Sequence, residues 1–340
     1  MQQAIKTENT SRDTAASTKG TTAAAGRTTA IPGITIDFTT LHQVQQNVSA
    51  SARHGKALLQ QVGQFFSQYK GRGMDFAEVR AYQAGDDIRS IDWRVTARTG
   101  KAHTKLYHEE RERPIWIAVD QSHSQFFGTK NCFKSVQACL IGAQLAWQAQ
   151  QLGDRIGSLV FSEQSQHHHL PCTGKKGLQA LFQFMVDYNQ MLALSPQGST
   201  THPETSNPKP LEHALKSLLE YAAPGSFVVL ISDFADFDSN IRTQLQQLAH
   251  KTHLLSYYVF DPIEADLPTP QSKKRQAYYI GEGDQQLKLN LQDKKFHDTL
   301  ANDFTRQFEA VKTCIQNAGG HFMSCSTEEA LLPVMRKVNP

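Results

Sequence analysis

Oxygen-bearing side chains cluster in the pentapeptide Asp120-Gln121-Ser122-His123-Ser124. It directly follows an apolar run over 115–119, which is typical of a buried strand. The pattern D-x-S-x-S puts one carboxylate and two hydroxyls on one short loop, and hard divalent cations such as Mg²⁺ prefer oxygen ligands of this kind. A turn that caps the next helix uses the same residue types, so a metal site and a structural turn both remain open.

A second acidic side chain, Asp233, follows the most hydrophobic run of the chain, residues 227–232. Open α/β sheets bind ligands beyond the carboxyl ends of their strands, so a doubly wound sheet could bring Asp233 beside the Asp120 loop. We therefore predict a partial coordination shell for Mg²⁺ from Asp120, Ser122, Ser124 and Asp233. A helix-capping or turn role for Asp233 is the alternative.

Strand and helix patterns alternate after Pro114, which indicates an α/β fold with a doubly wound, mostly parallel sheet and helices on both faces. Strands are predicted at 115–120, 155–161, 227–232 and 254–260. Helices are predicted at 132–152, 177–191, up to residue 221, 239–250, 298–318 and 328–338. A small hairpin is predicted to pair 277–280 with 287–289.

Three parts are predicted along the chain. Residues 1–33 are rich in Thr and Ala and hold no aromatic residue, so we expect a disordered tail. Residues 34–113 are expected to form N-terminal helices and an Arg/Asp-rich β subdomain, with short strands near 78–82 and 102–107. Residues 114–340 are expected to form the α/β domain.

The charge balance gives no sign of a nucleic-acid partner. The excess of Lys and Arg over Asp and Glu is 35 − 32 = 3, and residues 71–113 hold nine basic against eight acidic side chains. A nucleic-acid surface would need clustered positive charge. No apolar run reaches the ~18–20 residues of a spanning helix, and no signal peptide is seen, so we expect no membrane segment and a cytoplasmic location.

Two sets of motifs resemble known families. The chain resembles a von Willebrand factor A domain at Asp120–Ser124, Gly153–Gly157 and Leu230–Asp233. It is also similar to the bacterial domain of unknown function 58, at Gly71–Arg80, Gly85–Trp93, Ala97-Arg98 and Asp261–Glu264. These resemblances imply a von Willebrand A-like fold with a metal-ion-dependent adhesion site.

The resemblance also implies a function. Such proteins are commonly encoded beside AAA+ ATPases of the MoxR type. We therefore expect a non-catalytic protein-interaction module that partners a MoxR-type AAA+ ATPase, a client protein or both, in chaperone-like assembly or maturation of proteins. A carboxylate from the partner would complete the Mg²⁺ shell. Many relatives carry N-terminal membrane helices, which are not expected here.

The chain departs from the A-domain pattern at one ligand. Those domains usually supply a threonine just before the helix that here runs through 211–215, and the place near Lys209 holds no hydroxyl. Thr200, upstream in a longer loop, is the nearest match and the fifth candidate metal ligand. Ordinary polar loop sequence is the alternative explanation of Thr200.

Two other functions stay open. The same aspartates could position an ion-bound water in a metal-assisted hydrolase, with His123 as the nearby candidate base. Alternatively, the chain could be a scaffold with a degenerate metal site that binds through the surface of 71–113.

His167-His168-His169 is predicted to lie in a solvated hairpin and not to form a metal cluster, because adjacent strand residues point to opposite faces. Trp93, Trp116 and Trp147 are each predicted to be core residues.

Overall fold

The computed structural model describes ten stretches of the chain. They are 31–54, 76–83, 86, 88, 91–107, 114–194, 209–266, 278–282, 285–289 and 294–329. Thr200, residues 1–30 of the predicted tail and residues 330–338 of the last predicted helix lie outside the described residues.

A six-stranded sheet forms the centre of the α/β domain. Its strand order is β10-β7-β6-β3-β4-β5, and every neighbouring pair is parallel except β4 with β5. The strands are β3 (Ile115–Asp120), β4 (Ile156–Phe161), β5 (Gln166–Cys172), β6 (Phe227–Ser232), β7 (His253–Phe260) and β10 (His321–Ser326). Because β3 and β6 are neighbours, with Val119 opposite Ile231, their carboxyl ends lie side by side.

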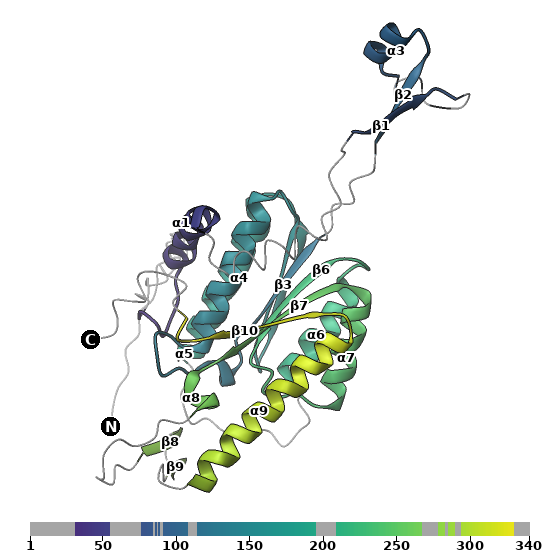
Figure 1. Cartoon of the computed structure of the whole chain (residues 1–340). Coiled ribbons are helices and arrows are strands. Elements are labelled where there is room, and N and C mark those ends of the chain that lie inside the picture. Colours follow the sequence, from purple (N-terminus) through teal and green to yellow (C-terminus); the bar gives the residue numbers. More distant parts are fainter. Residues whose placement is uncertain are drawn as a thin grey trace, which may run out of the picture.

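Helices cover both faces of this sheet (Figure 1). One face packs against α1 (Phe38–His54), α4 (Lys134–Gln151) and α5 (Lys175–Leu194). The other packs against α6 (Pro210–Tyr221), α7 (Ser239–Lys251) and α9 (Lys294–Asn317). Side chains of β3 alternate between the two cores: Ile117 belongs to the first, and Trp116 and Ala118 belong to the second.

Several smaller elements follow β3 along the chain. They are η2 (His123–Gln125), α8 (Pro262–Ala265), and the hairpin of β8 (Tyr278–Glu282) and β9 (Gln285–Leu289). Among the described residues, no helix is both long and apolar enough to cross a membrane.

A small module precedes the sheet and consists of β1 (Phe76–Ala81), α3 (Trp93–Thr99) and β2 (His103–Tyr107). The strands pair antiparallel. Helix α3 begins after Asp92, whose carboxylate accepts hydrogen bonds from the backbone of Arg94 and Val95, and it ends at Gly100 with φ 70°. Trp93 is 68% exposed, so its prediction as a core residue is wrong: it occupies the first turn of a helix that buries none of its side chains.

The predicted fold class is confirmed: this is an α/β protein with a doubly wound, mostly parallel sheet, consistent with a von Willebrand A-like fold. The four predicted strands are present within a residue at each end. Helix α3 and the edge strand β10 were not predicted. The helix predicted from residue 328 does not begin there, since Glu328 and Glu329 lie in a turn and a bend.

The histidine run lies in the predicted hairpin, on β5. His167 Nδ1 is 2.8 Å from the hydroxyl of Tyr188 on α5, whereas the ring of His168 stacks on Tyr221 of α6 at 4.4 Å between centroids. The two neighbours therefore face opposite sides of the sheet, as the alternation of a strand requires.

Candidate metal site

The loop after β3 is held in place by its own backbone and by two buried amides. The backbone N–H of Ser122 donates to Asp120 Oδ1 at 2.9 Å. The amide of Gln121 donates to the carbonyls of Asp120 and Ser135, and Asn189 of α5 donates to Gln121 Oε1 at 3.1 Å. These contacts tie the loop to α4 and α5 and keep Asp120 almost fully buried, at 3% exposed.

The end of β6 meets this loop through Ser232. Its hydroxyl donates to Asp120 Oδ2 at 2.5 Å and accepts from the backbone N–H of Phe234 at 2.9 Å. Phe234 has a φ of 52°, which is uncommon for a residue other than glycine. Burial of its ring against Tyr258 and a bond from Gln307 to its carbonyl hold it there, so packing maintains the turn that carries Asp233.

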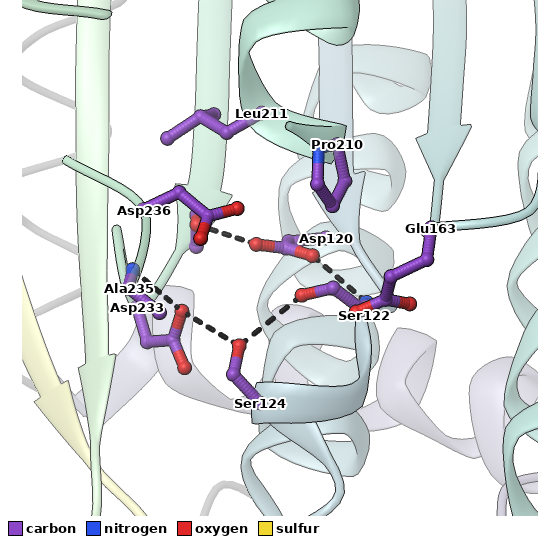
Figure 2. Close-up of a pocket in the computed structure, with 10 residues that line it drawn as sticks. Asp120, Ser122, Ser124, Glu163, Pro210, Leu211, Asp233, Ala235 and Asp236 are labelled. Atoms are coloured by element: carbon purple, nitrogen blue, oxygen red, sulfur yellow. Dashed lines mark hydrogen bonds between the residues drawn. The ribbon is translucent and has the colours of Figure 1, made fainter. Parts of the chain in front are cut away.

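Four of the five sequence-predicted ligands converge beyond these strand ends (Figure 2). Ser124 Oγ donates to Asp233 Oδ1 at 3.1 Å and lies 3.2 Å from Ser122 Oγ. Adjacent ligands of an octahedral Mg²⁺, each about 2.1 Å from the ion, are about 3.0 Å apart. The serine and aspartate oxygens therefore have the chemistry and spacing that fit Mg²⁺.

A polar pocket of about 310 Å³ opens over these oxygens. Besides the predicted ligands, its lining includes Glu163, Pro210, Leu211, Ser232, Ala235 and Asp236. Glu163 accepts the backbone N–H of His123 at 2.7 Å, which brings a carboxylate from the β4–β5 turn to the rim. Within the described part of the chain, no three His, Cys, Asp or Glu side chains group as a metal site, so any ion here depends on the serine oxygens.

The pocket concentrates negative charge. Burial, and to a smaller extent the nearby charge of Asp233, raise the pKa of Asp120 to about 7 against the opposing effect of its hydrogen bonds from Ser122 and Ser232. Burial also raises the pKa of Asp236, against the effect of Lys209. A divalent cation would offset both penalties, because opposite charge nearby favours ionised carboxylates.

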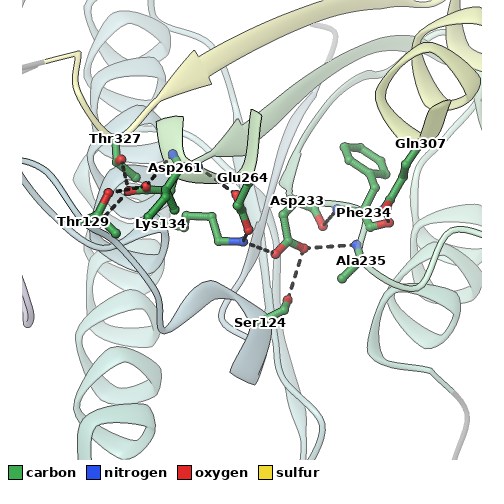
Figure 3. A network of polar contacts seen from close by, with 12 residues as sticks. Ser124, Thr129, Lys134, Asp233, Phe234, Ala235, Asp261, Glu264, Gln307 and Thr327 are labelled. Carbon is green, nitrogen blue, oxygen red and sulfur yellow. Dashed lines mark hydrogen bonds and ion pairs between the residues drawn. The ribbon is translucent and has the colours of Figure 1, made fainter. Parts of the chain in front are cut away.

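One buried cation, Lys134, contacts the site from the first turn of α4 (Figure 3). Its Nζ lies 2.9 Å from Asp233 Oδ2 and 2.7 Å from Glu264 Oε1 on α8. Burial lowers the pKa of Lys134, but the two carboxylates outweigh that effect and the pKa is raised overall. The sequence analysis missed this residue. A lysine at a helix N-terminus, where the helix dipole disfavours positive charge, was the available signal.

Asp261 anchors the next strand end. Its carboxylate accepts hydrogen bonds from the backbone and hydroxyl of Thr129 and from the hydroxyl of Thr327. It also forms a capping box with Glu264 at the start of α8. The network fixes the position of Glu264, and through Glu264 that of Lys134 (Figure 3).

The fifth candidate, Thr200, lies outside the described residues. At the start of α6, where an A domain would supply its threonine, Lys209 donates to Asp238 Oδ2 at 3.0 Å. The next two residues, Pro210 and Leu211, line the pocket without a side-chain oxygen. No ligand from the start of this helix is therefore seen among the described residues.

Fold and site together define an α/β protein with an acidic, hydroxyl-lined pocket at the carboxyl edge of a doubly wound sheet. The chain belongs to the family described as protein of unknown function DUF58, whose model matches residues 78–310, more than half of the chain. The resemblance to the bacterial domain of unknown function 58 is thereby confirmed.

Similar proteins were found among curated sequences and among solved structures. Uncharacterized proteins of Mycobacterium bovis and Mycobacterium tuberculosis are 29% identical over 198 residues, which span 58% of this chain and 58% of each relative. Among solved structures, conserved hypothetical protein BatB from Bacteroides thetaiotaomicron matches 63% of this chain and 90% of its own, with 14% identity and a TM-score of 0.38. An aerotolerance-related membrane protein from Bacteroides fragilis matches 67% and 96%, with 14% identity and a TM-score of 0.35.

Proposed function

We propose that this chain is a non-catalytic protein-interaction module whose pocket binds Mg²⁺ and presents it to a carboxylate of a partner protein. The observation that carries the proposal is the convergence of Asp120, Ser122, Ser124 and Asp233 on one pocket, with the oxygens of Ser122, Ser124 and Asp233 in succession at octahedral spacing. These side chains supply fewer oxygens than the six that Mg²⁺ takes. A vacant position is therefore left for an outside oxygen ligand.

The charge of the pocket supports an acidic partner that binds only with the cation. Asp120, Asp233, Asp236 and Glu163 face or rim the opening, and they would repel a carboxylate in the absence of a metal. A divalent ion reverses the local sign, because it is the largest charge in such a site. Binding should thus depend on the cation and on an Asp or Glu of the partner.

The proposed partner is an AAA+ ATPase of the MoxR type, a client protein, or both, in chaperone-like assembly or maturation. Membership of the DUF58 family and the resemblance to A domains support this choice. The cytoplasmic location expected from the sequence belongs to the same proposal.

A capture experiment tests the proposal. The full chain is immobilised, and the amount of a purified MoxR-type ATPase that it retains is compared between wild type and Ser124→Ala. Both measurements use the same Mg²⁺ buffer, so any effect of Mg²⁺ on the ATPase itself is the same in both. We expect Ser124→Ala to retain at least about tenfold less ATPase, because loss of a side chain that supports a metal site typically lowers metal affinity by about 10–100-fold. Ser239→Ala, an exposed serine at the start of α7, is the matched control. Equal retention by all three proteins would contradict the proposal.

A further inference from the structure

Lys134 places a permanent positive charge inside the site. It is 3% exposed, and its ammonium is shared between Asp233 and Glu264 at 2.9 and 2.7 Å. The remaining oxygen of Asp233, Oδ1, accepts hydrogen bonds from Ser124 and from the backbone of Ala235. One of the two site aspartates is therefore already neutralised in part before any ion arrives.

We infer that Lys134 is an internal cation that competes with the metal for Asp233 and keeps the metal affinity of the site low. The inference rests on the proposed function, since it concerns the same metal. Like charges repel strongly at short range in a buried setting, where salt screens little. A carboxylate from the partner would restore the missing negative charge, so ion and partner would be held together more tightly than the ion alone.

Glu264 controls how much of the ammonium charge acts on Asp233. It belongs to α8, it holds Lys134 at 2.7 Å, and its side chain is 31% exposed, so it can be changed without opening the core. Removing the charge of Glu264 leaves Lys134 with Asp233 alone. Removing the charge of Lys134 instead leaves Asp233 fully available to the ion.

The two substitutions should therefore shift metal affinity in opposite directions. Lys134→Met should tighten Mg²⁺ binding by at least about tenfold, and Glu264→Gln should weaken it by about threefold or more. If the pair merely supported the loop, either change would loosen the site, and affinity would fall in both variants. The opposite signs separate an electrostatic role from a structural one.

Isothermal titration of the full chain with Mg²⁺ alone measures these shifts. Lys209→Met is the control, because Lys209 also lies beside the pocket but is 43% exposed and pairs with Asp238. An exposed charge is well screened, so its removal should change affinity by less than about twofold. Circular dichroism establishes that each variant is folded. If Lys134→Met does not fold, Lys134→Gln replaces it, because a neutral amide removes the same charge and can still hydrogen-bond to both carboxylates; the same tighter Mg²⁺ binding is expected, and weaker or unchanged binding would contradict the inference.

The outcomes separate this inference from the proposed function. If wild type binds Mg²⁺ and Ser124→Ala does not, the metal site stands. Unchanged or weaker binding by folded Lys134→Met, or tighter binding by Glu264→Gln, would then overturn the role of Lys134 alone. If neither wild type nor Lys134→Met takes up Mg²⁺, both the metal site and the inference are wrong.

Discussion

Asp120 is the residue at which stability and the proposed function oppose each other. It lies in a nearly closed environment, accepts bonds from Ser122 and Ser232, and faces the charge of Asp233. Ionisation of this carboxylate is unfavourable without a cation, yet a metal ligand must be ionised. The same feature that would favour Mg²⁺ therefore makes the metal-free protein less stable.

Replacement of Asp120 by the neutral isostere Asn tests this conflict. The folded-state pKa of about 7 lies above the ordinary value, so the stability of the metal-free protein should fall as pH rises from about 4 to about 7. In EDTA at about pH 8, the unfolding free energy of Asp120→Asn should exceed that of wild type by on the order of 2 kcal/mol, measured by urea denaturation. A less stable variant would show that ionised Asp120 carries no such penalty.

The sequence was informative about residues on strand ends and uninformative about their partners. Asp120, Ser122, Ser124 and Asp233 could be predicted because two apolar runs mark the strands that position them. The pairing of Lys134 with Asp233 and Glu264 could not be predicted, since Lys134 lies 99 positions before Asp233 and 130 positions before Glu264 in the chain and no local pattern joins them. Such long-range ion pairs follow only from the packed fold.

At the scale of elements, two tryptophans with the same sequence prediction behave differently. Trp147 of α4 is buried, and its Nε1 donates to the carbonyl of Leu41 at 3.0 Å, which fastens α1 to the sheet domain. Trp93 of α3 is exposed. An isolated aromatic side chain in a polar segment gives no periodic pattern, so the sequence could not separate a core position from a surface one.

Alanine substitution should distinguish these two positions. Trp147→Ala removes a buried ring and leaves a cavity, so the unfolding free energy should fall by about 3–5 kcal/mol. Trp93→Ala should change it by less than about 0.5 kcal/mol, because the ring has little packing to lose. Chemical denaturation of both variants checks this, and a large loss in Trp93→Ala would mean that α3 is covered in the folded protein.

Other elements were missed for related reasons. Strand β10 occupies the edge of the sheet, and its mixed sequence His321–Ser326 lacks both an apolar run and regular alternation. Helix α3 is short, but Asp92 before it and Gly100 after it are the cap residues that could have predicted it. The buried strands β3 and β6 were predictable because the first five side chains of each are apolar.

For the molecule as a whole, Asp261 joins segments that are far apart in the chain. It binds Thr129 after β3, Thr327 after β10 and the start of α8. Burial raises the pKa of Asp261, but these hydrogen bonds outweigh burial and hold the pKa below its ordinary value. Its contribution to stability should therefore be complete above the ordinary carboxyl pKa and be lost as pH falls through the lowered value.

Asp261→Asn should lower the unfolding free energy by about 1–3 kcal/mol at neutral pH, because hydrogen bonds to a charged group are lost. The deficit should shrink as pH falls below the ordinary carboxyl pKa and through the lowered pKa of Asp261, where the wild-type carboxylate itself becomes protonated. Urea denaturation across this pH range measures the effect, with the exposed Asp266→Asn as control. Parallel pH profiles for wild type and Asp261→Asn would contradict the assignment.

The melting temperature in Mg²⁺ against EDTA tests the central claim most directly. An ion that binds only the folded protein must stabilise it, by about 2.7 kcal/mol at a hundredfold excess over its dissociation constant. We predict that the wild-type chain melts several degrees higher in Mg²⁺, and that the double variant Ser122→Ala, Ser124→Ala melts at one temperature in both buffers. A wild-type protein that melts equally with and without the ion would contradict a metal site at this pocket.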